Sequence, residues 1–527
     1  MNRTTLSLFA ATAGLAVITG IAALNPPSDG GRTVTKSVGR LPVQRSTLLC
    51  PAPTSSDVGQ TTYTAFTPPG KGTAGSPAEL LPAAGPARTD AGKSDGKDSK
   101  DSKDAKAKEP KGSKETKESK ESKEAAKDDP GKPVLSLKEA GKPVSTTTER
   151  SDAPALLGTA DGALAPGWTA QQTTVVAAGS GRGLHGTACT PPDTSFWFPG
   201  VSTAKGRQDY VHLTNPDASA AVVDLELFGP EGRTGAASGE GVTVPPHATV
   251  PVLLSTLTDT PTDQLTLHVA ARSGRVGAAV QVADDKLGGD WLPPSADAAP
   301  AAVLPGVPAD ATSVRLVAFA PGNDDADLSV RLAGPSGSIS PAGHEALHVK
   351  AGMTTAVELG DVTRGEAGSL VLTGARGSAP IVAALRVTRG KDDKQETAFI
   401  PATPPVEVRG TVADNRPGAA TLALTAPGRD AQVKVTSSAG SEGGTAVSKT
   451  YTVKAGTTLA VEPPRPTGGK GVYAVTVEKV SGGPVHASRM LALPKDGVPM
   501  FTVQPVRDDR STVAVPETGQ DLSVLTG

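Results

Sequence analysis

The chain has 527 residues and a net charge of −2, and 37% of its residues are hydrophobic, 3% aromatic and 20% charged. This length predicts several domains. The near-zero net charge excludes a field that would attract nucleic acid or an anionic membrane, and the scarcity of aromatic side chains excludes a stacking surface for single strands. Gly and Pro are abundant, and Val, Leu and Ala dominate the apolar set, which favours sheets with small cores.

Residues 1–24 form the predicted targeting segment. Leu6–Leu24 contains no charged residue, follows Arg3 and is about long enough to cross a bilayer. Two interpretations remain open. The segment is either a cleaved signal peptide, with Gly20 and Ala22 near the cleavage point, or an uncleaved single-pass anchor whose N-terminus stays inside. Both interpretations predict that the rest of the chain is extracytoplasmic.

A charged stretch is predicted between residues 92 and 150. From Lys93 to Asp129 there are 12 Lys and 11 Asp or Glu residues and almost no apolar ones. Such a segment has no apolar face to bury against a core, so we predict a disordered insertion. Residues 25–91 and 151–196, on either side of it, are predicted to form one divided N-terminal β domain.

The two cysteines lie on opposite sides of this insertion. An even pair in an exported chain predicts a disulfide between Cys50 and Cys189, which would join the two halves of the divided domain. The alternative, a reactive thiol, would need a nearby basic group to lower its pKa, and neither cysteine has one in the sequence.

The remaining chain repeats itself with a period of about a hundred residues. Trp197–Val201 recurs as Val303–Val307 and, more loosely, as Phe399–Ala402, and each is followed by alternating apolar runs separated by Pro and Gly. This pattern predicts an all-β chain of tandem immunoglobulin- or fibronectin-III-like β-sandwich repeats after the N-terminal apolar helix. The predicted boundaries are 197–300, 301–397 and 398–510, with a polar tail at 511–527.

One motif resembles a zinc-hydrolase signature. His344, Glu345 and His348 match H-E-x-x-H, in which two histidines on one helical face bind the metal and the glutamate acts as base. The repeats align this stretch with strand–turn–strand sequences instead. On a strand, side chains four residues apart lie about 13 Å apart, too far to chelate one ion. A zinc hydrolase is therefore the least favoured functional hypothesis.

Three further stretches resemble known functional motifs, but for each we favour an interpretation without that function. Gly181–Gly186 matches the dinucleotide fingerprint G-x-G-x-x-G, but no helix start follows it, so a hairpin loop is predicted. Val515–Gly519 resembles a sortase signal but lacks the following apolar span and basic tail. Asp324–Asp327 is the densest acidic group and is expected to be a solvated loop rather than a calcium site.

Two tryptophans are the best candidates for a binding surface. Trp197 and Trp291 lie beside Pro-Gly and Pro-Pro corners, where an exposed ring could contact a ligand. The alternative, which we favour, is that both rings cover hydrophobic cores.

The chain resembles a known family. Phe196–Gly200, the Asn215-Pro216 and Gly229-Pro230 corners, the two cysteine sites and the N-terminal apolar segment are similar to those of an actinobacterial family of exported or membrane-anchored proteins, domain-of-unknown-function family 5719. The resemblance implies a location at the cell envelope and carries no activity or functional residue with it.

These observations predict a non-enzymatic envelope protein whose sandwiches bind or scaffold a partner protein. An array of modules that bind cell-wall carbohydrate is the alternative. We predict no catalytic, cofactor-binding or metal-binding residue, no nucleic acid or small-molecule substrate, and a membrane contact only through Leu6–Leu24.

Overall fold

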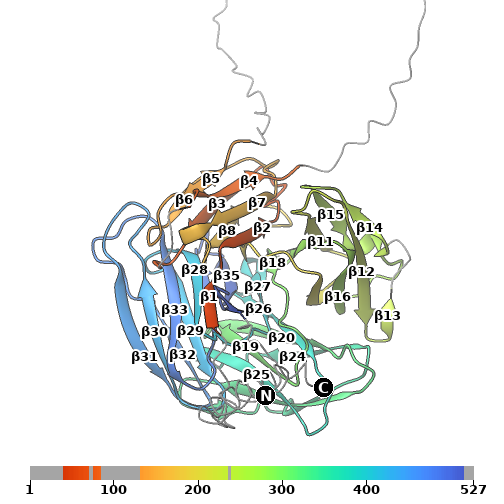
Figure 1. Cartoon of the computed structure of the whole chain (residues 1–527). Coiled ribbons are helices and arrows are strands. Elements are labelled where there is room, and N and C mark those ends of the chain that lie inside the picture. The colour runs from red at the N-terminus through yellow and green to blue at the C-terminus, as the bar shows by residue number, and fades with distance from the viewer. Residues whose placement is uncertain (1–38, 71–74, 85–130, 235–238, 516–527) are drawn as a thin grey trace, which may run out of the picture. The chain divides into compact units, whose positions relative to one another are not determined.

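The computed structural model describes residues 39–70, 75–84, 131–234 and 239–515 (Figure 1). These residues are organised in antiparallel sheets with a few short 3-10 turns, which confirms the predicted all-β class. The chain divides into two compact units, and Pro42–Thr512 forms the larger. The other unit contains most of β1 (Gly39–Pro42) and of β36 (Thr512–Val515), which pair with each other. No helix in the described ranges is long and apolar enough to span a bilayer, and the predicted segment Leu6–Leu24 lies outside those ranges.

The larger unit contains four β-sandwiches. Sandwich 1 consists of β2 (Arg45–Cys50), β3 (Gly59–Phe66), β4 (Ala78–Pro82), β5 (Leu135–Leu137), β6 (Val144–Thr148), β7 (Leu156–Asp161), β8 (Thr169–Val176) and β9 (Gly183–Ala188), with the 3-10 turn η1 (Gly162–Leu164). Sandwich 2 consists of β10 (Ser195–Val201), β11 (Arg207–Thr214), β12 (Ala221–Gly229), β13 (Gly232–Thr234), β14 (Val242–Val244), β15 (Thr249–Leu253), β16 (Leu265–Ser273), β17 (Gly277–Asp284) and β18 (Gly288–Leu292), with η3 (Leu254–Thr256).

Sandwiches 3 and 4 follow in the same way. Sandwich 3 consists of β19 (Ala301–Val307), β20 (Ala311–Phe319), β21 (Ala326–Ala333), β22 (Ser338–Ile339), β23 (Ala346–Val349), β24 (Thr354–Gly360), β25 (Gly368–Gly374), β26 (Val382–Arg389) and β27 (Glu396–Pro401), with η4 (Asp392–Lys394). Sandwich 4 consists of β28 (Arg409–Asn415), β29 (Ala420–Ala426), β30 (Ala431–Ser437), β31 (Val447–Val453), β32 (Thr457–Val461), β33 (Tyr473–Gly482), β34 (His486–Ala492) and β35 (Phe501–Val506).

The four sandwiches share one strand order. In what we call sheet I of each sandwich, the orders are β2-β7-β4-β5, β10-β16-β12-β13, β19-β25-β21-β22 and β28-β33-β30-β31. In sheet II, they are β6-β3-β8-β9, β15-β11-β17-β18, β24-β20-β26-β27 and β32-β29-β34-β35. The divided N-terminal domain is therefore a fourth copy of the unit that the sequence repeats three times.

Two boundary predictions were wrong. The charged insertion was predicted to reach residue 150, but β5 and β6 lie in residues 135–148 and complete the two sheets of sandwich 1. Leu135 and Leu137 are buried in its core, so this part of the chain does have an apolar face. Residues 85–130 lie outside the described ranges.

Phe399–Ala402 does not open a sandwich either. It contains the end of β27, which pairs with β26 and completes sheet II of sandwich 3. Sandwich 4 begins only at β28. The sequence similarity to Trp197–Val201 therefore joins a last strand to a first strand.

The repeated Pro-Gly pairs form β-bulges. The register of β10 against β16 shifts between Pro199 and Val201, and that of β19 against β25 shifts between Pro305 and Val307. The intervening Gly200 and Gly306 have φ of 106° and 90°, a conformation that favours glycine.

Contacts between sandwiches close a cycle within Pro42–Thr512. The last strands β9, β18, β27 and β35 contact one another in the order β9–β18–β27–β35–β9, and β18, β27 and β35 lie side by side in Figure 1. Sandwich 4 meets sandwich 1 at Gln171, whose Oε1 accepts the N–H groups of Ala413 and Asp414 at 2.8 Å. The four sandwiches therefore contact one another in a closed cycle and not in a linear series.

Candidate functional site

At each junction of the cycle, sheet I of one sandwich faces sheet II of the next. The junction between sandwiches 2 and 3 is filled by an aromatic cluster of Trp197, Phe228, His268 and Phe319. Trp197 stacks on His268 with ring centroids 3.8 Å apart and lies 5.3 Å from Phe319 of sandwich 3. Phe319 also packs 4.7 Å from Phe228. Large rings thus fill the space between these two sheets.

Small side chains occupy the corresponding positions between sandwiches 1 and 2. Trp197 and His268 face each other in the register of β10 against β16, one residue from the core pair of Phe198 and Leu267. Thr47 and Thr159 face each other at the same place in the register of β2 against β7. The aromatic cluster therefore has no counterpart from these two strands.

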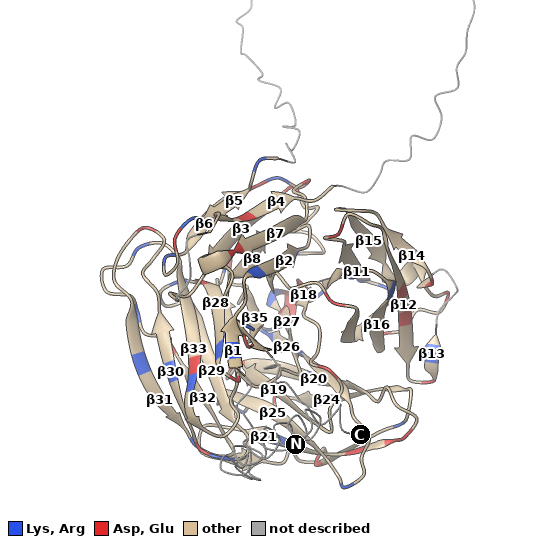
Figure 2. Cartoon of the chain, viewed as in Figure 1, with Lys and Arg blue, Asp and Glu red and all other residues tan. Residues whose placement is uncertain are grey.

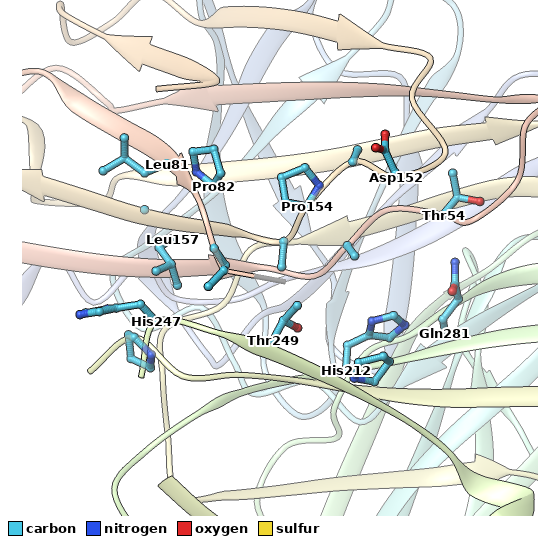
Figure 3. A pocket seen from close by; sticks show the side chains of 18 of the residues that line it. Thr54, Leu81, Pro82, Asp152, Pro154, Leu157, His212, His247, Thr249 and Gln281 are labelled. Carbon is cyan, nitrogen blue, oxygen red and sulfur yellow. The ribbon is translucent and has the colours of Figure 1, made fainter. Parts of the chain in front are cut away.

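A cleft of about 1150 Å³ opens at this junction. Figure 3 shows Leu81, Pro82, Pro154 and Leu157 of sandwich 1 facing His212, Thr249 and Gln281 of sandwich 2. The wall from sandwich 1 is lined by Thr47, Ala52, Thr54, Ser55, Leu81–Ala84, Ser151–Ala155 and Leu157–Thr159. The wall from sandwich 2 is lined by Gln208, Tyr210, His212, Pro216, His247, Thr249, Pro251, Arg275 and Gln281.

Backbone pairing fixes one end of the cleft. Ala84 forms a parallel bridge with Ala248, in which its N–H donates to the carbonyl of His247 at 2.8 Å and its carbonyl accepts the N–H of Thr249 at 3.2 Å. Gln281 also donates to the carbonyl of Pro53 at 3.2 Å. The two walls are therefore held together at two separate points.

His212 is the buried polar group of the cleft. Its side chain is 9% exposed and lines the cleft, and its ring lies 5.4 Å from that of Trp291. Burial is the main effect and lowers the pKa of His212 to about 4, whereas the neighbouring Gln281 acts to raise it. No hydrogen bond of ordinary geometry from the described residues reaches either ring nitrogen. The ring is thus neutral at physiological pH, and both of its nitrogens are buried.

The charges around the cleft are paired within the chain. Arg150 donates to Asp152 at 2.8 Å and lowers the pKa of that carboxyl, and Arg275 donates to both carboxylate oxygens of Asp217 at 3.0 and 3.1 Å. Figure 2 shows acidic and basic residues interspersed over the sandwiches. An occupant of this cleft would meet an apolar, nearly neutral surface.

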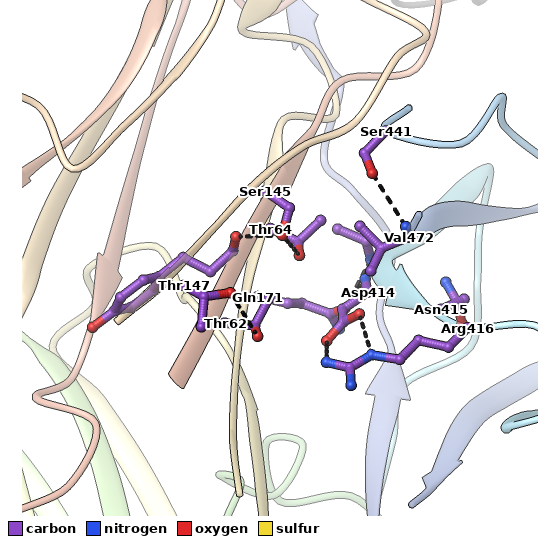
Figure 4. Close-up of polar contacts among 12 residues, drawn as sticks. Thr62, Thr64, Ser145, Thr147, Gln171, Asp414, Asn415, Arg416, Ser441 and Val472 are labelled. Atoms are coloured by element: carbon purple, nitrogen blue, oxygen red, sulfur yellow. Dashed lines mark hydrogen bonds and ion pairs between the residues drawn. The ribbon is translucent and has the colours of Figure 1, made fainter. Parts of the chain in front are cut away.

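A second cleft, of about 880 Å³, lies between sandwiches 4 and 1, and several of its polar groups are bonded within the chain. In Figure 4, Thr62 contacts Thr147 at 3.3 Å, and Arg416 contacts both carboxylate oxygens of Asp414 at 3.3 Å. Ser441 accepts the N–H of Val472 at 3.2 Å. The second cleft is the smaller of the two, and its lining includes the charged residues Lys138, Glu139 and Lys142.

The H-E-x-x-H residues lie on a turn and a strand. His344 and Glu345 precede β23, and His348 lies on β23, exposed, with its Nδ1 2.8 Å from Asp327. The placement predicted from the repeats is confirmed, and the helix that two-histidine zinc binding needs is replaced by a strand. No group of three or more His, Cys, Asp or Glu within the described ranges could hold a metal ion.

The predicted hairpin is present between β8 and β9, with Gly181 of the motif in its turn and Gly183 and Gly186 on β9. The predicted disulfide between Cys50 and Cys189 is present and joins the end of β2 to the chain just after β9. Pro516–Gly519 of the sortase-like motif lie outside the described ranges.

The two tryptophans are not an exposed binding surface. Trp291 is 1% exposed, and Trp197 is half-buried in the aromatic cluster.

His212, Thr47 and Thr159 were not predicted as site residues, because none of them belongs to a recognisable motif. An alignment of sandwich 1 with the other repeats would pair Thr47 with Trp197 and so indicate that sandwich 1 lacks an aromatic ring at this position.

Comparison with known proteins gives a family without an activity. The model of a family of unknown function, DUF5719, matches residues 144–464, from β6 of sandwich 1 into sandwich 4. No curated protein and no solved structure matches the chain. The matched range covers more than half of the 527 residues, so this chain belongs to the DUF5719 family of unknown function.

Proposed function

We propose that this protein is a non-enzymatic binding protein whose cleft between sandwiches 1 and 2 takes an uncharged, extended segment of a partner protein. The observation that carries the proposal is the open junction itself. Where sandwiches 2 and 3 meet, aromatic rings fill the space, and where sandwiches 1 and 2 meet, the same strands present Thr47 and Thr159 around a cleft of about 1150 Å³. This volume slightly exceeds the roughly 300–1,000 Å³ of small-molecule pockets, which favours a polymer segment.

The lining favours a peptide over a glycan. Sugar rings are expected to stack on exposed aromatic side chains, and Tyr210 is the single Phe, Tyr or Trp among the described lining residues. Ala, Pro and Leu side chains can bury the apolar side chains of a peptide. The neutral ring of His212 adds no charge to this lining.

We further propose that the protein works in the cell envelope. The disulfide between Cys50 and Cys189 supports an oxidising compartment. Leu6–Leu24 would direct export and either anchor the chain or be removed. The partner would then be an envelope protein, and a cell-wall polymer is the alternative.

A double substitution that restores the missing rings tests the binding proposal. Thr47→Trp with Thr159→His introduces the stacked pair of the neighbouring junction into the cleft. We expect this variant to keep its fold and to lose at least tenfold in affinity for the partner, because about 1.4 kcal/mol of lost contact suffices for that change. The measurement is capture from solubilised envelope fractions, followed by titration of the captured protein.

The matched control is Thr243→Trp, an exposed strand position on sandwich 2 that does not line the cleft. Equal capture by both variants would contradict the proposal. Capture of purified cell-wall glycan by the wild type, lost in the double variant, would replace the protein partner by the carbohydrate alternative.

A further inference from the structure

Strand β9, the inner strand of sandwich 1, is held by two carboxyl groups from other sandwiches. The N–H of Leu184 donates to Oε1 of Glu396 in sandwich 3 at 3.0 Å. The N–H of Gly186 donates to Oδ1 of Asp290 in sandwich 2 at 2.9 Å. Side-chain acceptors from two different sandwiches thus bind the backbone of a third. We call these two contacts the β9 latch.

The glycines of the G-x-G-x-x-G motif make room for the latch. A Cβ atom on Gly183 would lie 2.5 Å from Oε1 of Glu396. A Cβ atom on Gly186 would lie 2.5 Å from Cγ2 of Thr502 in sandwich 4. The carbonyl of Gly186 accepts the Thr502 hydroxyl at 3.5 Å. All three other sandwiches therefore reach this short segment of β9.

Both latch carboxyls are fully buried, and neither forms an ion pair. Glu396 and Asp290 are 0% exposed, and Oε2 of Glu396 and Oδ2 of Asp290 have no hydrogen-bond partner among the described residues. Burial raises the pKa of Glu396 to about 8 and raises that of Asp290 well above its ordinary range. Glu396 therefore carries a proton at neutral pH while β9 is docked, and burial favours the protonated form of Asp290 as well.

The surrounding charged groups do not offset the rise in the pKa values of Glu396 and Asp290. Arg182 and Arg389 lower the pKa of Glu396, but Arg182 donates to the carbonyls of Asp393 and Gln395, and Arg389 forms an ion pair with Asp310. Glu396 itself raises the pKa of Asp290. The remaining titratable groups nearby are Arg489, which interacts with Asp290, and His185, which burial keeps neutral by lowering its pKa to about 4.

We propose that the β9 latch is pH-dependent: protonated Glu396 and Asp290 keep β9 docked, and a rise in pH weakens the docking because release lets both groups reach water and ionise. Opening then releases protons, so it becomes more favourable as pH rises between the ordinary carboxyl range and the range in which the docked groups ionise. Below that interval the latch is at its tightest.

The latch lies directly behind the proposed binding cleft. The Asp290 carboxyl accepts the N–H of Trp291, and the ring of Trp291 contacts that of His212, which lines the cleft. Gly186 of sandwich 1 and Asp290 of sandwich 2 also belong to the two sandwiches that form its walls. Docking of β9 would therefore regulate the cleft of the proposed function, although the latch itself is tested without any ligand.

Hydrogen exchange of the Leu184 and Gly186 amides tests the latch. We expect their protection, corrected for intrinsic exchange, to fall between pH 5 and 8 in the wild type by up to about tenfold per pH unit for each proton released. Glu396→Gln keeps the acceptor oxygen but cannot ionise, so it is expected to reduce this slope. Glu396→Gln combined with Asp290→Asn is expected to abolish it.

The control is Glu366→Gln, an exposed position on sandwich 3, which should leave the slope unchanged. An unchanged slope in the double variant, or no slope in the wild type, would overturn the proposal. If the double variant does not fold, the infrared band of protonated carboxyl groups in the wild type decides. The band is expected at neutral pH and should weaken in folded Glu396→Gln, and its absence from the wild type would exclude the latch.

Discussion

At the scale of single residues, two glycines determine how sandwich 1 meets the other three. Gly183 and Gly186 lie where the side chains of Glu396 and Thr502 approach the backbone of β9. Their spacing imitates a nucleotide-binding fingerprint, but its physical cause is the close approach of neighbouring sandwiches. A glycine motif therefore has to be placed on its strand before it is assigned a chemistry.

This interpretation predicts unequal effects within one motif. Gly186→Ala would place a Cβ atom 2.5 Å from Thr502 and should lower the free energy of unfolding by about 1–3 kcal/mol through overpacking. Gly181→Ala meets its nearest atom at 4.0 Å and should change stability little. Chemical denaturation of the two variants makes the comparison. Equal losses would contradict the role assigned to Gly186.

Trp197 is the second residue whose role is testable. It contacts His268 in its own sandwich and Phe319 in the next. Because the ring is half-buried, Trp197→Ala should cost about 2–3 kcal/mol, somewhat less than the about 3–5 kcal/mol of a fully buried aromatic side chain. Val480→Ala, at a 54% exposed position, is the control and should stay within about 0.5 kcal/mol in thermal unfolding. A wild-type melting temperature for Trp197→Ala would show that the cluster does not stabilise the junction.

At the scale of elements, alternation made the sheets predictable. In β12 buried and partly exposed residues alternate along the whole strand, and comparable runs in each repeat gave the correct all-β sandwich class. The sequence did not reveal sandwich 1 as a further copy of the repeat, because β5 has three residues and β6 is almost entirely Ser and Thr. Neither strand has a strong apolar alternation, and the Lys-rich stretch lies just before them.

The candidate site was predictable from the sequence only through an alignment of sandwich 1 with the other three, and not from any motif. The cleft is open because Thr47 and Thr159 are small where the neighbouring junction has large rings. Small side chains at two separate positions do not form a recognisable sequence motif. The buried polar contacts at Gln171 and Glu396 join elements more than two hundred residues apart in the chain. No local pattern indicates such pairs, because the contact depends on how the sandwiches meet.

The disulfide gives a prediction for sandwich 1. Cys50 and Cys189 are separated by 139 residues and join its first strand to the segment after its last. Replacing both by Ser should cost about 2–5 kcal/mol, as for other native disulfides, with the loss confined first to sandwich 1. Limited proteolysis with and without reductant would locate it. Cleavage beginning in sandwich 3 or 4 would contradict this assignment.

At the scale of the whole larger unit, the four sandwiches depend on one another. Phe399 of sandwich 3 packs in the core of sandwich 2, and Phe501 of sandwich 4 packs in the core of sandwich 3. Gln171 and the β9 latch close the cycle at sandwich 1. The cleft walls therefore come from the first sandwich and its neighbour in a closed set, so partner binding and closure of the cycle should be linked.

The central claim is that the cleft between sandwiches 1 and 2 binds a protein segment, and site-specific photo-crosslinking tests it most directly. A photoreactive residue at Thr159, which lines the cleft, is compared with one at Thr243, which does not, in envelope fractions analysed by mass spectrometry. We expect a cross-linked peptide from one defined partner at residue 159 and none at residue 243. Identical cross-links at both positions, or none at residue 159 under conditions where the partner is captured, would contradict it.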